Sequence, residues 1–252
     1  MTTLAFKTLD PIAWLAQQPL RENEHLYLII SAASDTDALG TYRLSGPSHP
    51  LLPIWSETPY CTWHAVMPYV TKLAPESTFL PWITETDALD WGWLAVSRCE
   101  PEEVLAHLRS LTQVKMPKGR EVFFRFWDGR FIYPILEGLG DDAQALLPVF
   151  ERYLINGKPL EASPRKVPMV QDWPWWEVPQ GLLDALAEQD QSAPIDNLMQ
   201  WLEEEHPDIH CAWPRSVLKR KVGYFSKLIG AEANPQQTLL DVLRLEQKTV
   251  LE

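Results

Sequence analysis

The chain has 252 residues, of which 46% are hydrophobic, and a formal net charge of −12. This length and composition allow a full hydrophobic core, arranged as one large domain or as two lobes. The acidic balance disfavours a nucleic acid or an anionic membrane surface as partner, because such partners attract positive charge. No segment reaches the roughly 20 apolar residues that a membrane-spanning helix requires. We therefore expect no nucleic-acid partner and no membrane span.

The cysteines indicate a reducing compartment. Cys61, Cys99 and Cys211 lie far apart and are odd in number, which argues against a disulfide framework. The first ten residues also lack the basic start and the apolar run of a secretory signal. These features predict a cytoplasmic protein.

The first 158 residues alternate between strand and helix patterns. Asp10, in N-cap position before Pro11, marks the start of the first helix. The predicted helices are 11–18, 101–111, one that starts near 130, and 141–153. The predicted strands are 26–30, 65–70, 82–83, 92–97 and 122–127. This alternation predicts an α/β or α+β lobe over residues 1–158, with a mixed sheet and flanking helices.

The rest of the chain changes character. Residues 159–180 are rich in proline and tryptophan and lack a sustained period, which predicts a connection between lobes. Apolar stripes at helical spacing then predict helices at 181–189, 195–205, 214–229 and 235–248. We expect a smaller, all-helical C-terminal lobe over residues 181–252.

The well-marked catalytic motifs are absent. The sequence contains no P-loop, no Rossmann glycine fingerprint and no G-x-S-x-G elbow. Cys61 lies close to His64, but catalytic partners are typically distant in sequence. Two histidines and a cysteine in 206–211 are interrupted by Pro207, which ends a preceding helix. We therefore assign no catalytic residue, no metal and no cofactor.

Two groups of side chains are candidates for contact with a protein. The tryptophans of the connection can form a core plug, a protein-binding anchor or a sugar-stacking platform, and their proline-rich context favours the first and then the second. The basic residues within 215–221 form either a solvated helix face or a docking patch. The candidate partner-binding residues are Trp173, Trp175, Trp176, Arg215, Lys219 and Arg220.

The segment 122–130 reads Val-Phe-Phe-Arg-Phe-Trp-Asp-Gly-Arg and precedes a predicted helix. Arg125 would lie on the same strand face as Phe123 and Trp127, so a buried Arg125 needs a nearby acid such as Asp128. The segment thus predicts an ion pair that closes a strand–turn–helix corner.

This pattern resembles the type VI secretion effector chaperones, also called adaptor proteins of the Tap or TEC type, whose domain is catalogued as domain of unknown function 4123. The runs at 26–33 and 91–97 are also similar to that family, and the resemblance covers residues 24–155. Gly129 stands where the family usually has Pro, and Ser31 where it usually has Asp.

The resemblance implies a non-enzymatic protein that binds a cognate secreted effector and delivers it to the spike, which is VgrG or a PAAR-type protein. It also implies that Arg125, Asp128 and Arg130 maintain the fold of the corner. Two alternatives stay open. An immunity or inhibitor protein would use the acidic charge to bind a basic toxin. A hydrolase with an unmarked acid–base site would need a deep pocket with clustered acids.

Overall fold

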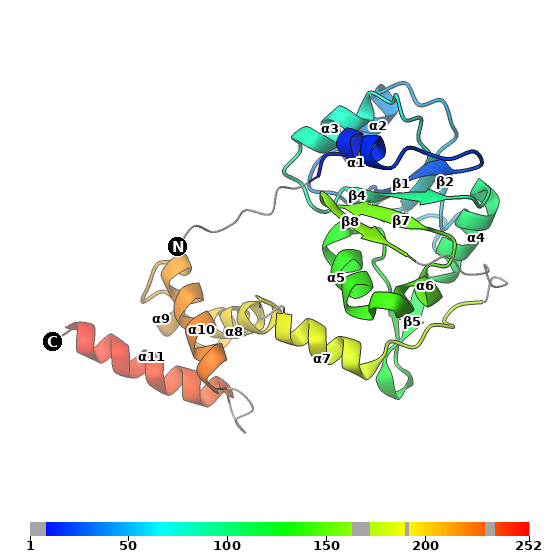
Figure 1. Ribbon diagram of the computed structural model, residues 1–252. Helices are drawn as coiled ribbons and strands as arrows, with labels where there is room; N and C mark the ends of the chain where they lie inside the picture. The colour runs from blue at the N-terminus through cyan, green and yellow to red at the C-terminus, as the bar shows by residue number, and fades with distance from the viewer. Residues whose placement is uncertain (1–8, 163–171, 190–191, 230–234, 252) are drawn as a thin grey trace. The chain divides into compact units, whose positions relative to one another are not determined.

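The computed structural model describes residues 9–162, 172–189, 192–229 and 235–251 (Figure 1). The chain forms two compact units, residues 1–183 and residues 184–252. Of the connection expected at 159–180, residues 159–161 lie in a strand, 172–180 belong to the first unit, and 163–171 lie outside the described residues.

The first unit is built on a six-stranded sheet with the strand order β2-β3-β1-β4-β7-β8. Its strands are β1 (His25–Ser31), β2 (Leu52–Pro53), β3 (Pro68–Lys72), β4 (Gly92–Ser97), β7 (Arg152–Ile155) and β8 (Lys158–Glu161). A separate hairpin pairs β5 (Gln113–Lys115) with β6 (Glu121–Phe123). The α/β class is confirmed, but the pairings between neighbouring strands of the six-stranded sheet are antiparallel, whereas we expected a mixed sheet.

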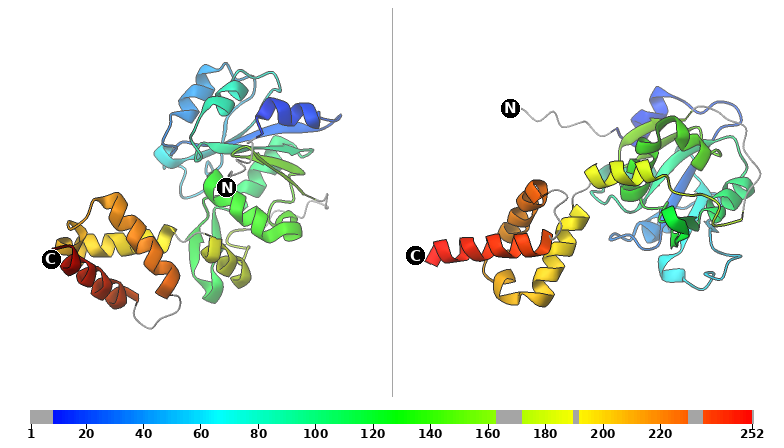
Figure 2. Two further views of the ribbon diagram at one scale, coloured as in Figure 1. Left: turned by 60° about the vertical axis from the view of Figure 1, so that its left-hand side comes forward. Right: turned by 90° about the horizontal axis from the view of Figure 1, so that it is seen from below.

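Helices lie on both faces of the six-stranded sheet, as Figures 1 and 2 show. One group comprises α1 (Pro11–Gln17), α2 (Ala38–Leu44) and α3 (Phe79–Glu85). The other side carries α4 (Pro101–Ser110), α5 (Gly129–Leu139) and α6 (Ala143–Leu146), and α7 (Gln180–Gln189) follows. Short 3-10 turns occupy His64–Val66, Pro117–Gly119 and Gly140–Asp142.

The central strand β1 is buried on both faces, which explains its continuous apolar run. Leu26, Leu28 and Ile30 pack with side chains of α1, α2 and α3 in one core cluster. Successive side chains of a strand point to opposite faces, so Tyr27 lies on the other side, with its ring 6.2 Å from that of Phe150. Side chains on the two faces of β1 thus pack against residues on both sides of the sheet.

Several predicted elements are confirmed. The Asp10 side chain caps α1 by accepting a hydrogen bond from Ala13 N at 2.8 Å. The strands β1 and β4 and the helices α1, α4 and α5 lie where their patterns predicted them. The strand expected at 65–70 begins only at Pro68, because residues 64–66 form a 3-10 turn.

Three predictions in the first unit are wrong. The pair 82–83 lies in helix α3, since Trp82 stacks on Phe79 one turn earlier at 4.9 Å. The helix expected at 141–153 ends at residue 146 because Pro148 follows, and residues 152–153 lie in β7, which pairs with β4. The strand expected at 122–127 covers only 121–123, because the chain then turns toward α5.

The second unit is helical over its described residues. It contains α8 (Ser192–Glu205), α9 (Pro207–His210), α10 (Arg215–Ile229) and α11 (Pro235–Leu251), so the helices predicted there are confirmed and the short α9 is an addition. Its buried core comprises Met199, Leu202, Ile209, Leu218, Val222, Leu239, Leu240 and Leu243. In the parts of the chain that the structure describes, every helix is too short or too polar to cross a membrane.

A buried carboxylate ties the start of β1 to two neighbouring strands. Glu24 accepts a hydrogen bond from Arg21 N at 3.0 Å and lies 3.3 Å from the guanidinium of Arg98 and 3.5 Å from that of Arg152. Burial by itself raises the pKa of Glu24, but the bond from Arg21 and the two guanidinium groups outweigh it. The pKa of Glu24 therefore lies below its ordinary value.

We predict that Glu24→Gln lowers the free energy of unfolding by about 2 kcal/mol at about pH 7, because it removes charge-assisted hydrogen bonds. A depressed carboxyl pKa stabilises the fold above the unfolded value of about 4.5 and loses that effect as the pH falls through the folded value. Urea titrations at about pH 7 and about pH 3 should therefore show a large difference from the unsubstituted chain only at the higher pH.

The exposed Glu22, two residues earlier, provides the matched control, and Glu22→Gln should leave the stability unchanged at both pH values. An equal loss for Glu24→Gln at both pH values would contradict the electrostatic account.

Candidate protein-binding surface

Asp128 lies between β6 and α5 and is the N-cap of α5. Its side chain is only 1% exposed and accepts hydrogen bonds from Arg130 N at 3.0 Å, from Arg130 Nη2 at 2.9 Å and from Arg125 Nη2 at 2.9 Å. Arg130 Nη2 also lies 3.6 Å from the carboxylate of Asp90. The structure therefore brings the three residues of the predicted corner together, around one buried acid.

The expectation of a buried Arg125 is wrong. The Arg125 side chain is 48% exposed, and its guanidinium lies over the ring of Phe131 at 5.0 Å. The strand ends at Phe123, so Arg125 no longer follows the strand alternation that would have placed it inside. The buried charge of the corner belongs to Asp128, and both guanidinium groups reach it from the surface.

Asp90 links the corner to the loop after β1. It accepts hydrogen bonds from Ser34 Oγ and Asp35 N, both at 2.9 Å. Burial raises the pKa of Asp90, but these bonds and the Arg130 guanidinium outweigh that effect, so the pKa is lowered. Hydrogen bonding to Asp128 raises the pKa of Arg130. The corner is thus a network of fixed charges.

Gly129 lies where a side chain would meet the β7–β8 turn. A Cβ at this position would lie 2.8 Å from Asn156 Nδ2, in the turn between β7 and β8. Asn156 is held there because its Nδ2 also donates to Leu89 O at 3.1 Å. A side chain at 129 would displace the Asn156 amide, whereas glycine lets this turn pack on the start of α5 without that shift.

Next to the corner, five aromatic rings form a cluster that we call the aromatic platform: Trp55, Tyr60, Trp63, Phe123 and Trp127. Trp55 is buried at its centre, and its ring lies 5.2 to 6.3 Å from the other four. Trp63 and Phe123 stack at 5.6 Å, yet they are 47% and 38% exposed. Two buried indoles thus support two stacked rings that face solvent.

Arg109 of α4 fixes the loop that carries the first half of the platform. Its Nε donates to Ile54 O at 2.9 Å, its Nη2 donates to Ser56 Oγ at 2.9 Å, and its Nη1 forms an ion pair with Glu57. The loop between β2 and β3 is therefore held against α4. We predicted no role for the tryptophans of this loop, although the close spacing of Trp, Tyr and Trp in a proline-rich segment is a signal that could have found them.

The tryptophans of the connection pack against the same unit. Trp175 Nε1 donates to Ser110 Oγ at 3.0 Å, and its ring lies 6.1 Å from His107. The ring of Trp176 lies 5.7 Å from that of Phe124. These side chains and Trp173 are half-buried, so each ring keeps an accessible part.

The backbone of this segment also runs along β5. Lys115 N donates to Trp176 O at 2.9 Å, and Val178 N donates to Lys115 O at 2.8 Å. Lys115 and Glu177 therefore form a parallel bridge. The segment behaves as an added strand at one edge of the β5–β6 hairpin.

The candidate basic residues lie on the surface of the second unit. Arg215 is exposed at the start of α10, and its guanidinium lies 3.7 Å from Glu203. Lys219 and Arg220 are also exposed, whereas Leu218 of the same helix is buried in the unit's core. The structure therefore places these three basic residues on the solvent side of α10.

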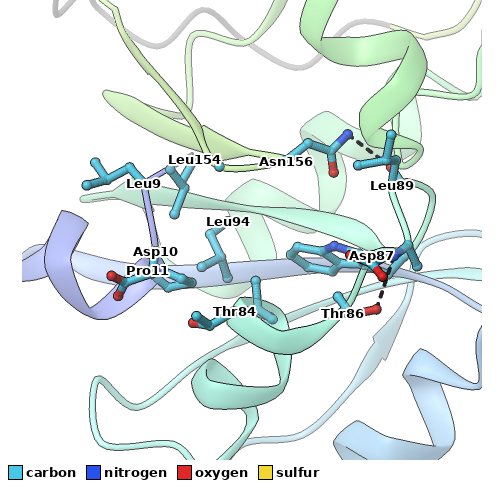
Figure 3. A pocket seen from close by; sticks show the side chains of 14 residues that line it. Leu9, Asp10, Pro11, Thr84, Thr86, Asp87, Leu89, Leu94, Leu154 and Asn156 are labelled. Carbon is cyan, nitrogen blue, oxygen red and sulfur yellow. Dashed lines mark hydrogen bonds between the residues drawn. The ribbon is translucent and has the colours of Figure 1, made fainter. Parts of the chain in front are cut away.

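Figure 3 shows a pocket of about 270 Å³ between the start of α1, the end of α3 and the β7–β8 turn. Its carboxyl groups, Asp10 and Asp87, lie at opposite ends, and Asp10 is engaged in capping α1. Leu94 and Leu154 line the space between them. The pocket does not gather acids, so it lends no support to an acid–base hydrolase.

The other groups considered from the sequence are dispersed. Cys61 and His64 are exposed in the loop between β2 and β3. The ring of His206 packs on Trp201 at 4.7 Å, while Cys211 is exposed. Among the described residues, no three His, Cys, Asp or Glu side chains come together as metal ligands.

Comparison with known proteins finds a family match within the first unit. Residues 26–146 match the family "Domain of unknown function (DUF4123)". The "Accessory protein VasW" of Vibrio cholerae serotype O1 is 29% identical over 136 residues, which are 54% of this chain and 45% of that relative. The chain thus matches less than half the length of this relative, and no solved structure matches it. The matched range contains both the Asp128 corner and the aromatic platform, and the two matches support a relation of this domain to the type VI secretion effector chaperones and adaptors.

Proposed function

We propose that this protein is a non-enzymatic adaptor that binds a cognate type VI secretion effector in the cytoplasm and helps to load it onto the VgrG or PAAR-type spike protein. The observation that carries the proposal is the exposed stack of Trp63 and Phe123 within the family domain. Exposed aromatic side chains with a rigid backing are typical of the residues that dominate protein interfaces.

The Asp128 corner would serve this function indirectly. Trp127, next to Asp128 in the chain, lies 5.2 Å from Trp55 at the centre of the platform. The corner therefore orients a ring that supports the exposed pair. A surface that is already ordered before binding loses less conformational entropy on association, which favours affinity.

The first test is co-purification with the products of the adjacent genes, followed by affinity measurement on the isolated complex. We expect the double variant Trp63→Ala, Phe123→Ala to weaken binding by at least about 2 kcal/mol, or about thirtyfold, because it removes the exposed stack.

The matched control for this loss is Leu44→Ala, which truncates an 89% exposed apolar side chain elsewhere on the same unit. Equal affinity of the double variant and the control would remove the platform from the interface. A partner toxin that is neutralised in vitro, and not only carried, would instead favour an immunity protein.

A second test asks whether the Asp128 corner stabilises the fold, as distinct from contacting the partner protein. We predict that Asp128→Asn lowers the free energy of unfolding by about 2 kcal/mol, because the amide cannot provide a charged acceptor for two guanidinium groups. Chemical denaturation measures this loss. The exposed Asp141, at the other end of α5, supplies the control Asp141→Asn, which should change stability by less than about 0.5 kcal/mol. Similar stabilities for the two variants would mean that the corner does not hold the fold.

A further inference from the structure

The hydrogen bonds of the β5–β6 hairpin determine which backbone groups face its outer edges. Bonds at both ends of the hairpin fix the pattern, from Met116 N to Arg120 O at 2.7 Å and from Phe124 N to Thr112 O at 3.1 Å. Bonded pairs alternate along an antiparallel ladder, so the bonded pair between them is Val114 with Val122. The residues on either side of Val114 and of Val122 therefore direct their N–H and C=O groups outward.

The outer edge of β5 shows what such groups can hold. Lys115 is one of the outward-facing residues, and its N–H and C=O bind Trp176 O and Val178 N of the chain's own extended segment. The ring of Trp176 then packs on Phe124. This edge thus captures an extended backbone together with an aromatic side chain.

The outer edge of β6 offers the same set of groups. Glu121 and Phe123 are its outward-facing residues, and within the described part of the chain no other segment forms a backbone hydrogen bond with them. Figures 1 and 2 show the hairpin standing apart from the six-stranded sheet. Sheet edges normally need protection from added strands, and this one lies beside the exposed stack of Phe123 on Trp63.

We propose that an extended segment of a partner protein adds to β6 as a further strand. Phe123 and Glu121 are two residues apart and share one face of the hairpin. The segment would therefore place an apolar side chain on Phe123 and Trp63, and a Lys or Arg two residues away opposite Glu121. The chain's net charge of −12 also favours a basic segment over an acidic one.

This inference deepens the proposed function, because it rests on that function for the identity of the partner as effector or spike protein. The strand addition itself depends only on the hairpin and the platform. It can therefore be tested with a synthetic peptide in the absence of either partner.

The probe is a fluorescein-labelled peptide in which Leu and Lys alternate and a Thr separates each from the next. The full-length protein is titrated into the peptide, and binding is measured by fluorescence anisotropy. Glu121→Pro removes an outward N–H without removing a bond of the hairpin. Arg120, at φ −70° and ψ 126°, already has a conformation that a following proline accepts. We expect Glu121→Pro to bind at least about tenfold more weakly than Glu121→Ala, which lacks the carboxylate but keeps the N–H.

A second measurement leaves the protein unaltered. One peptide is methylated at the backbone nitrogens of Leu and Lys, and a second at those of Thr. Each set of methyl groups blocks the hydrogen bonds of one edge of the added strand. For an antiparallel strand, only methylation at Leu and Lys should abolish binding, because those N–H groups face Phe123 and Glu121. Equal effects of the two methylation patterns, or no saturable binding to the unsubstituted chain, would overturn the proposal.

The two proposals fail separately. Peptide binding that obeys this pattern, without a complex from the adjacent genes, would reject the adaptor function and leave strand addition in place. A stable complex whose affinity is the same for Glu121→Pro and Glu121→Ala would keep the adaptor function and reject strand addition.

Discussion

The carboxylate of Asp128 is the interaction on which the surface of the first unit depends. It is buried and caps the start of α5. It accepts hydrogen bonds from the guanidinium groups of Arg125, which precedes it in the chain, and of Arg130, which follows it. A buried carboxylate without such partners would cost several kcal/mol, and the charged hydrogen bonds that Asp128 accepts offset that cost. Because Trp127 immediately precedes it, the same charge network sets the position of a ring in the aromatic platform.

In the interface that we propose, the platform and the β5–β6 hairpin provide two kinds of contact. The exposed rings of Trp63 and Phe123 offer apolar area, which contributes most to affinity at protein interfaces. The outward N–H and C=O groups of β6 would determine the orientation of the partner segment, because they can pair only with an extended backbone in the correct register. On the opposite edge, β5 already holds the chain's own segment through Lys115. A partner would thus extend an arrangement that the fold already uses.

Two titratable groups of the first unit, Asp90 and His107, have pKa values below their ordinary range. The pKa of Asp90 is lowered by hydrogen bonds and by Arg130, and His107 is buried, with its pKa lowered by that burial and its Nε2 2.9 Å from Leu146 O. Hydrogen bonds also hold both side chains in place. A fixed position suits residues that shape a binding surface such as the one we propose.

The sequence by itself determined the elements whose signals are local. The Asp10–Pro11 start of α1, the buried runs of β1 and β4 and the amphipathic stripes of α4, α8, α10 and α11 depend on neighbouring residues, so they could be predicted. Tertiary structure alone decided that Arg125 lies outside and Asp128 inside, because the strand stops at Phe123 where the chain turns to α5. It alone also brought Trp55 and Trp63 to Phe123, since contacts between segments so distant in sequence arise only when Arg109 and the sheet position the loop.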